Sequence, residues 1–523
     1  MSALPPASAS TYQELYDLGF TKCTPYQHQL RVWEEARERE AFAVLWEMGL
    51  GKSLYIIMTA AWLWSKGLID GVITIGNKGS YRNWVDKEVP EHWPNAGAAT
   101  GVTPGSTTAP QTATASPAMS AANRSVQTGY WSSYATKEVQ GQLEALLRVG
   151  AGTLPWLTIN VEAFSTDGAD AFLAAYRKRY KRLLIVVDES TTIKAPKSKR
   201  AKKVVKLCRT GAYRRIMTGS PLPESPLDAW AQYKALGDDM LGYPSFVAFK
   251  RRFAVEEIKQ FGSRSFIQVV GYQNLDELGR RMATCSSRLT KAECLDLPDK
   301  VYETVHVEME PEQRRVYKKL RDELLVEMDS GMITSAPHAL TKLVRLHQVA
   351  LGYLVGDEGG IEDLSDGRYN VLWDLLEEAG DAQTIVWSNF RHPLSKVVEG
   401  LQKRYGVKSV VAYHGGVSET GRRDAMERFL SGEARYFVSN PSVGGYGITL
   451  TNCNNVVYFS NGFKSEARLQ SEDRCHRIGQ TNKVTYTDIV ARGTIDERVL
   501  DALASKRDLA ESVLGDRLRE LLR

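Results

Sequence analysis

Short, predominantly apolar segments recur along this chain and alternate with stretches of helical periodicity. The segments are residues 42–46, 71–75, 183–187, 215–217, 384–387, 409–413, 436–438 and 456–459. Runs that are apolar at successive positions are typical of parallel strands buried on both faces. The alternation of such strands with helices therefore predicts an α/β fold built on parallel sheets.

The apolar segments fall into two blocks on either side of a helix-rich, charged middle region, residues 225–375. A chain of 523 residues has room for two large domains or about three smaller ones. We predict two α/β lobes with helical insertions. The predicted parts are an N-terminal segment 1–23, a first lobe 24–290 with a flexible loop 96–123 and a helical insertion near 225–287, and a second lobe 291–523 with a helical insertion near 315–375 and C-terminal brace helices.

Composition excludes several classes of protein. With 43% hydrophobic residues and a net charge of +5, the chain is neither wholly disordered nor a disulfide scaffold. No run approaches the length of a membrane span, and the N-terminus does not resemble a secretory signal. The cysteines are scattered, which favours reduced thiols in a cytosolic protein. They are Cys23, Cys208, Cys285, Cys294, Cys453 and Cys475.

The string WEMGLGKS lies between the apolar run AFAVL and the helix-like SLYIIMTAAWLW, which is the context of a phosphate-binding loop. Gly49 and Gly51 allow the backbone to curl so that its amides point at phosphate oxygens. Lys52 is expected to reach the β- and γ-phosphates, and Ser53 to ligate Mg²⁺. Trp46 stands where the general pattern has glycine. The tripeptide GKS alone also occurs by chance.

The string LLIVVDES is an apolar strand that ends in two adjacent carboxylates. We expect Asp188 to hold Mg²⁺ and Glu189 to orient and deprotonate the attacking water. The alternative interpretation is an acidic turn after a buried strand. The phosphate loop upstream favours the catalytic interpretation.

The string QSEDRCHRIGQ carries Arg474 and Arg477, which would share one face of a helix because they are three residues apart. This predicts a pair of arginine fingers that approach the γ-phosphate from the second lobe. The alternative is a solvated basic helix.

Taken in order, these segments resemble the Swi/Snf-type ATPases of helicase superfamily 2, over nearly the whole chain. TPYQHQL resembles the family's adenine-recognition motif, which places Gln27 on the adenine edge and Tyr26 beside it. WEMGLGKS resembles DEMGLGKT, and VGGYGITLT and DRCHRIGQ resemble motifs V and VI. In the acidic motif, Ser190 and Thr191 replace the family's Ala-His, so its coupling histidine is absent.

The resemblance implies two RecA-like lobes, ATP and Mg²⁺ as cofactors, and motifs that couple hydrolysis to lobe movement. Its coupling residues are Thr218, Gly219 and Ser220 of motif III, together with Gln470. It also places Lys78, Asn160, Asn389 and Thr449 near a nucleic-acid backbone. To these we add Lys194, from the basic stretch described next.

The density of positive charge in one stretch of the chain also favours contact with nucleic acid. Residues 177–215 contain fifteen lysines and arginines, and their only acidic residues are Asp188 and Glu189. Such density suits sequence-independent contacts with phosphates. A solvated helix face is the alternative for any single lysine.

These observations predict a DNA-stimulated ATPase that translocates on double-stranded DNA without reading its sequence. ATP hydrolysis would be coupled to closure of the lobes and to stepping along the DNA backbone. We expect a monomer in the cytoplasm of a bacterial or phage-infected cell, with a nuclear location as the alternative. We expect it to bind no membrane, and a protein partner is compatible with this function. Two alternatives stay open. One is a helicase that separates or anneals strands of branched DNA, and the other is a weak ATPase that recruits a partner.

Overall fold

The computed structural model describes residues 8–21, 24–78, 80–94, 125–261, 264–329, 336–356, 359–444 and 448–514. The chain divides into two compact units. The first contains Met1–Phe253, Gln273–Cys294 and Glu511–Arg523, and the second contains Ala254–Tyr272 and Leu295–Ala510. The predicted loop 96–123 and Cys23 lie outside the described residues.

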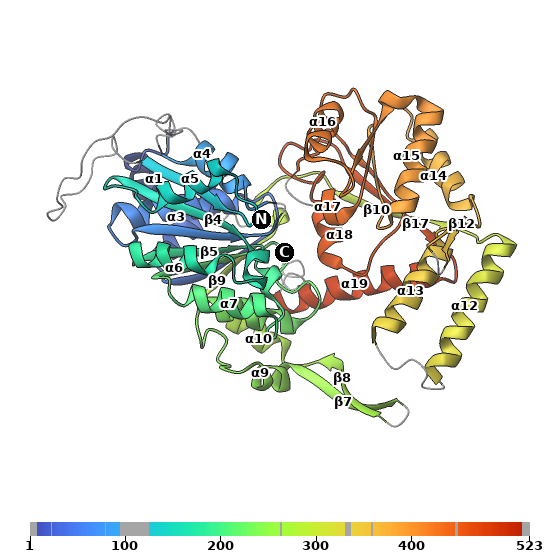
Figure 1. Ribbon diagram of the computed structural model, residues 1–523, viewed down its shortest axis with the longest axis horizontal. Coiled ribbons are helices and arrows are strands. Elements are labelled where there is room, and N and C mark those ends of the chain that lie inside the picture. Colours follow the sequence, from blue (N-terminus) through green and yellow to red (C-terminus); the bar gives the residue numbers. More distant parts are fainter. Residues whose placement is uncertain are drawn as a thin grey trace. The chain divides into compact units, whose positions relative to one another are not determined.

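The first unit is built on a seven-stranded parallel sheet with the strand order β3-β4-β2-β5-β6-β1-β9. Figure 1 labels β4, β5 and β9 of this sheet. The strands are β1 (Ala41–Trp46), β2 (Gly71–Gly76), β3 (Ser125–Trp131), β4 (Thr153–Asn160), β5 (Leu183–Asp188), β6 (Tyr213–Met217) and β9 (Ser286–Leu289). Because all strands run in one direction, the segments that follow β1, β5 and β6 meet at one edge of the sheet. That edge is where ligands bind in open α/β sheets.

Helices precede, connect and follow these strands. They are α1 (Ala9–Asp17), α2 (Gln27–Ala36), α3 (Lys52–Ser65), α4 (Val89–His92), α5 (Lys137–Leu146), α6 (Asp170–Arg179), α7 (Lys199–Cys208), α8 (Ala229–Leu236), α9 (Phe246–Phe253), α10 (Leu275–Ala283) and α11 (Lys291–Cys294). The predicted helical insertion near 225–287 contains α8, α9 and α10. It also contains an antiparallel hairpin, β7 (Ala254–Phe261) and β8 (Arg264–Tyr272), which the sequence analysis missed and whose residues belong to the second unit.

The second unit has a six-stranded parallel sheet with the order β10-β17-β16-β13-β15-β14. Its strands are β10 (Lys300–Val307), β13 (Thr384–Trp387), β14 (Val410–Tyr413), β15 (Tyr436–Ser439), β16 (Asn455–Tyr458) and β17 (Val484–Ala491). Its other elements are α12 (Pro311–Asp329), α13 (Ala336–Ala350), β11 (Tyr353–Val355), β12 (Ile361–Asp363), α14 (Gly367–Glu378), α15 (Arg391–Tyr405), α16 (Glu419–Leu430), α17 (Pro441–Gly444), α18 (Ser465–Glu472) and α19 (Ile495–Leu514). The predicted fold class, two parallel-sheet α/β lobes with helical insertions, is confirmed.

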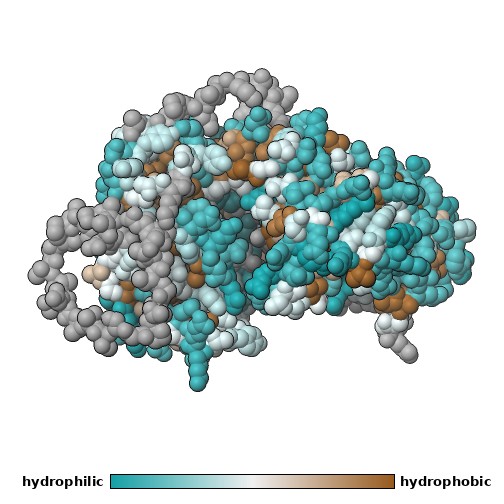
Figure 2. Space-filling model, turned by 90° about the horizontal axis from the view of Figure 1, so that it is seen from above, coloured by the Kyte–Doolittle hydropathy of each residue, from teal (hydrophilic) through white to brown (hydrophobic). Residues whose placement is uncertain are grey.

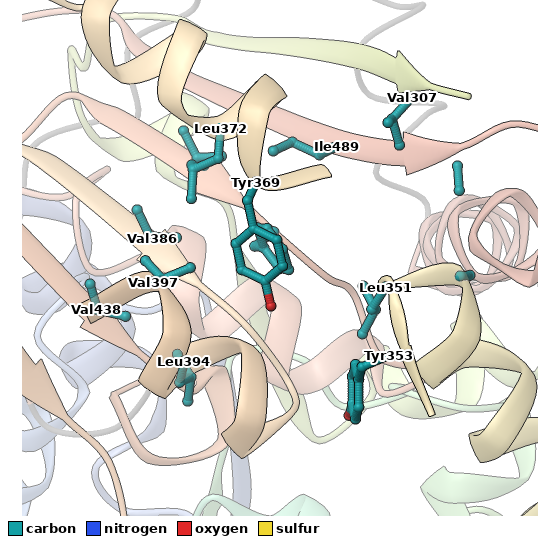
Figure 3. Close-up of a cluster of buried hydrophobic side chains, with 14 of the residues drawn as sticks. Val307, Leu351, Tyr353, Tyr369, Leu372, Val386, Leu394, Val397, Val438 and Ile489 are labelled. Atoms are coloured by element: carbon teal, nitrogen blue, oxygen red, sulfur yellow. The ribbon is translucent and has the colours of Figure 1, made fainter. Parts of the chain in front are cut away.

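The core of the second unit explains why its inner strand β13 is largely apolar. Val386 and Val438 lie with Leu372 of α14 and Val397 of α15 in one buried cluster (Figure 3). Trp387, the next residue along β13, lies in a second buried cluster on the other face of the sheet. Successive side chains of a strand point to opposite faces, so a strand covered on both faces is apolar at every position.

The outer surface is mixed. Figure 2 shows hydrophobic residues in small groups that hydrophilic residues separate. Among the residues that the structure describes, no helix is long and apolar enough to cross a membrane.

Candidate functional site

The loop between β1 and α3 has the backbone that a phosphate-binding loop requires. Gly49 and Gly51 have φ angles of 86° and 75°, in the left-handed region that favours glycine. Gly51 directly precedes Lys52, the first residue of α3. The first amides of that helix have no partner within the helix, so they can donate to an anion.

Gln29 supports this loop, although the sequence analysis did not single it out. Its Nε2 donates to the carbonyl oxygens of Leu50 (3.3 Å) and Gly51 (3.1 Å), and its Oε1 accepts from the backbone N–H of Tyr26 (2.8 Å). Gln29 is buried and is the third residue of α2, where a capping-box side chain reaches back to the residue before the helix. A glutamine at the third position of a helix is part of the capping-box pattern, so the sequence did contain a signal for the contact with Tyr26.

Replacing Gly51 with alanine should disable the loop. A Cβ at this position would lie 1.9 Å from Gln29 Nε2, and alanine is strained at a φ of 75°. We expect kcat/KM for ATP to fall by about 100-fold, since small displacements of a binding group have effects of that size. Steady-state phosphate release measures it.

The matched control is Gly67→Ala. Gly67 also has a positive φ, 67°, but no atom lies within 4 Å of its added Cβ. This variant should carry the same backbone strain and keep its ATP kinetics. Equal kinetics for Gly51→Ala and the control would contradict the role of the loop.

The residues predicted to recognise adenine lie beside the loop. The ring of Tyr26 stacks on His28 with centroids 5.6 Å apart, and His28 meets Trp46 edge-on, also at 5.6 Å. Burial lowers the pKa of His28, whose Nε2 donates to the carbonyl of Leu50 at 3.0 Å. Gln27 is exposed, and its amide donates to the hydroxyl of Tyr12 in α1.

A cavity of about 400 Å³ opens next to His28, lined by α2 and by β9 with its flanking residues. Arg31, Glu35, Thr284 and Arg288 contribute polar groups to its wall. The cavity continues the surface that begins at the predicted adenine motif.

Trp46, which departs from the family pattern, is fully buried. Its Nε1 donates to the hydroxyl of Ser287 in β9 at 3.1 Å. The next residue, Glu47, accepts from the backbone N–H of Lys291 at 2.8 Å and lies 3.7 Å from a guanidinium nitrogen of Arg288. Residues of β9 and α11 therefore hold the start of the phosphate loop, a long-range contact that the sequence did not reveal.

The two functional groups of the loop lie at the start of α3. Lys52 is 9% exposed, and its Nζ donates to the carbonyl oxygens of Trp46 (2.9 Å) and Glu47 (3.3 Å). Ser53 follows it in the first helical turn and is half-buried. The ammonium thus lies over the loop, where phosphates would be bound.

The acidic pair lies at the end of β5, as the sequence predicts: Asp188 is the last residue of the strand and Glu189 follows it. Burial raises the pKa of Asp188, and a hydrogen bond from Trp84 Nε1 (3.0 Å) and the charge of Lys52 oppose that rise. Glu189 has a φ of 49°, a left-handed conformation that is uncommon for a residue other than glycine. Backbone strain of this kind gathers at functional sites.

Motif III contacts both the acidic pair and the phosphate loop. Thr218 Oγ1 donates to Glu189 Oε2 at 3.2 Å, and the backbone N–H of Ser220 donates to Thr218 Oγ1 at 3.2 Å. A Cβ on Gly219 would lie 3.2 Å from the backbone nitrogen of Met48. The three predicted coupling residues of this motif therefore lie against the groups whose chemistry they are expected to sense.

The candidate ligands for Mg²⁺ are oxygen donors of the kind that this ion prefers, the hydroxyl of Ser53 and the carboxylate of Asp188. Within the described ranges no cluster of three or more His, Cys, Asp and Glu residues could hold a metal by itself. Ser53 and Asp188 therefore fit a Mg²⁺ ion that nucleotide phosphates also coordinate. Proteins usually bind Mg²⁺ with such a combination of a few side chains and substrate phosphates.

In the second unit, the predicted arginine pair lies beyond the helix that was expected to carry it. The spacing of the two arginines predicted that they share one face of a helix, but α18 ends at Glu472. Arg474 is buried and donates to the carbonyl oxygens of Gln470 (2.8 Å) and Ile448 (2.9 Å). Arg477 is half-buried and also reaches the carbonyl of Ile448, at 3.5 Å. A shared acceptor, rather than a shared helix face, therefore brings the two side chains together.

The predicted nucleic-acid residues of the first unit have different surroundings. Lys78 is exposed after β2. Asn160 Oδ1 caps the short helix after β4 by accepting from the N–H of Ala163 at 2.8 Å. Lys194 lies 3.7 Å from a carboxylate oxygen of Glu224. Contact with nucleic acid stays a prediction for all three.

In the second unit, Asn389 Nδ2 donates to the carbonyl of Ser460 at 3.0 Å, and Thr449 is exposed. Asn389 also lines a cavity of about 300 Å³ together with Phe463 and Lys464. Gln470, the remaining coupling candidate, donates to Glu466 at 3.2 Å within α18.

The basic stretch 177–215 is less positive in the fold than in the sequence. Asp167 lies 2.7 Å from Lys203 and 3.1 Å from Lys199, and Asp170 lies 2.8 Å from Lys203. These partners precede the stretch, so its composition did not show them. Lys202 and Lys206 are exposed on α7, and neither has an ion pair within the part of the chain that the structure describes.

Two parallel-sheet lobes and a phosphate loop facing an acidic pair define a P-loop nucleoside triphosphatase. Residues 26–351 match the family model of the SNF2-related domain, and residues 367–479 match the helicase conserved C-terminal domain. The first match covers more than half of the chain, which therefore belongs to the SNF2-related family. Membership of this family of ATP-dependent enzymes implies ATP hydrolysis.

Among curated proteins, the chain is similar to an uncharacterized ATP-dependent helicase of Mycoplasma genitalium, with 26% identity over 63% of this chain and 30% of the relative. It is also similar to the DNA annealing helicase and endonuclease ZRANB3 of Mus musculus, with 23% identity over 71% of this chain and 34% of the relative. The chain thus spans about a third of the length of these relatives. A solved Sulfolobus solfataricus SWI2/SNF2 ATPase core in complex with dsDNA has 21% identity, covers 99% of this chain and 96% of that one, and gives a TM-score of 0.39.

Proposed function

We propose that the chain is a DNA-stimulated ATPase that translocates on double-stranded DNA. The observation that carries this proposal is the set of direct contacts that joins the nucleotide site to motif III, above all the hydrogen bond from Thr218 to Glu189. A site that only bound nucleotide would not need its catalytic carboxylate bonded to a second motif. A motor does need such a link, because hydrolysis must be passed on as movement.

The residues of the first lobe, 24–290, bind and activate ATP in this proposal. Lys52 and the amides of the loop hold the β- and γ-phosphates, and Ser53 and Asp188 hold Mg²⁺. The bound ion offsets charge on the phosphate oxygens during transfer. Glu189 orients the attacking water and accepts its proton.

The second lobe, 291–523, supplies Arg474 and Arg477. Closure of the lobes brings these guanidinium groups to the γ-phosphate, where they stabilise the charge of the transition state. Hydrolysis cleaves off the γ-phosphate and so removes its attraction for the two guanidinium groups, and the lobes reopen. Alternate closure and reopening would move two nucleic-acid contacts relative to each other, which is the basis of stepping.

DNA as the substrate is supported by the name of the ZRANB3 relative and by the exposed basic residues of α7. Contacts with phosphates position a protein on DNA without reading its sequence. We therefore expect no sequence preference.

The variant Lys202→Ala/Lys206→Ala tests the α7 surface. If both lysines neutralise phosphates, the negative slope of log affinity against log salt concentration should become shallower by about 2. Half-saturation of ATPase stimulation by duplex DNA, measured over a series of salt concentrations, gives this slope. Lys199→Ala is the control, because Lys199 lies on the same helix but is paired with Asp167. An unchanged slope in the double variant would place the DNA elsewhere.

A second candidate is a helicase that separates or anneals strands, which the annealing-helicase name of ZRANB3 favours. Displacement of a third strand from a DNA triplex reports translocation, and displacement of one strand of a forked duplex reports separation. Activity in the first assay alone supports translocation. Activity in the second supports the helicase.

A further inference from the structure

A buried hydrogen bond joins the acidic motif to α8. Ser190, next to Glu189, is fully buried and donates through its hydroxyl to Gln232 Oε1 at 2.6 Å. Gln232 is 1% exposed and lies in α8. Ser190 is also one of the two positions at which this chain departs from the Ala-His of the family it resembles.

The other end of Gln232 is bound to the loop of motif III. Its Nε2 donates to the carbonyl oxygens of Pro221 at 2.6 Å and Asp228 at 2.9 Å. Two carbonyl acceptors fix the orientation of the amide, so its oxygen must face Ser190 and the serine must be the donor. Pro221 directly follows Ser220, the last of the three motif III residues.

These bonds close a ring of contacts around the catalytic carboxylate. One side is the bond from Thr218 to Glu189, and the other runs from Ser190 through Gln232 to Pro221. A displacement of Glu189 would therefore be transmitted to motif III at two points. A buried amide with all its partners satisfied is costly to disrupt, so the ring resists partial rearrangement.

We propose that the Ser190–Gln232 pair is a positioning and coupling element, which links the state of the ATP site to motif III where this chain lacks the coupling histidine. This inference rests on the proposed DNA-stimulated ATPase activity. Neither residue contacts the nucleotide phosphates in this scheme. Both act by fixing where Glu189 and the motif III loop lie relative to each other.

The test compares the ratio of DNA-stimulated to basal kcat in four proteins: wild type, Ser190→Ala, Gln232→Met, and the double variant. We expect each single variant to lower this ratio at least about fivefold, the lower end of usual coupling effects. Because the two side chains act as one unit, the double variant should be no worse than either single variant. Ser190→Thr keeps the hydroxyl and should retain the ratio.

Thr59→Ala is the matched control for loss of a buried hydroxyl. Thr59 lies in α3 of the same unit, and its hydroxyl bonds only within the helix, to the carbonyl of Tyr55 at 2.8 Å. This variant should keep the ratio even if its melting temperature falls. A purely structural role for Ser190 would lower basal and stimulated rates together, or lower only the melting temperature, and either result would overturn the inference. If the wild type itself shows no stimulation, the proposed function fails instead.

Discussion

Replacing Glu189 with glutamine should lower kcat for ATP hydrolysis by about 10²–10⁴-fold, the usual contribution of a positioned general base. The change removes the basic carboxylate but keeps the shape of the side chain. Thr218 can still donate to the remaining carbonyl oxygen, so the contact with motif III is preserved. Lys52 and the loop are untouched, and ATP should bind with nearly unchanged affinity. Phosphate release and a separate ATP-binding titration measure the two quantities.

The control for this variant is Glu224→Gln. Glu224 lies in the loop after motif III, where it pairs with Lys194 at 3.7 Å. It has the same chemistry as Glu189 but no assigned part in hydrolysis, so turnover should be retained. Turnover close to wild type in Glu189→Gln would refute its role as the base. Loss of ATP binding together with turnover would show that the side chain serves binding instead.

Removing the guanidinium of Arg477 should lower kcat by about 10³–10⁵-fold, the range seen for arginine fingers. Arg477 is the better of the two arginines for this test. Arg474 is buried and bonds two backbone carbonyls, so its loss would also disturb the fold. Arg477 is half-buried, and its Nη1 lies 3.5 Å from the carbonyl oxygen of Ile448, farther than Arg474 at 2.9 Å. Arg477→Ala should therefore keep its melting temperature while it loses turnover.

Arg477→Lys separates charge from geometry. A lysine keeps the charge but not the planar fork that binds phosphate oxygens in pairs, so recovery should be small. Arg423→Ala, at an exposed position of α16 in the same unit, is the control and should retain turnover. A fully active Arg477→Ala variant would contradict the assignment of the finger.

The strands show which parts of the fold the sequence could predict. β1, β5, β13 and β16 are buried on both faces, so they appear as apolar runs. β10 was missed because it is an edge strand with largely exposed side chains, and no apolar pattern is needed there. The edge strand β9 was missed because its sequence, SSRL, is polar, although its side chains are half-buried.

The site was predictable where function requires particular residues close together in the sequence. The glycines and lysine of the loop and the acidic pair at the end of β5 belong to this group, and the structure places them at one edge of the sheet. Contacts between distant segments were not predictable. The bond from Trp46 to Ser287 joins residues 241 positions apart, and no local pattern indicates it. The helix face predicted for Arg474 and Arg477 was wrong, because spacing alone does not show where a helix ends.

The central claim is that DNA controls ATP hydrolysis, and the most direct measurement is the ATPase rate with and without duplex DNA. The rate should rise on addition of duplexes of unrelated sequence, and the rise should be absent in Glu189→Gln. Equal rates without nucleic acid, with duplex DNA and with single-stranded DNA would contradict the claim.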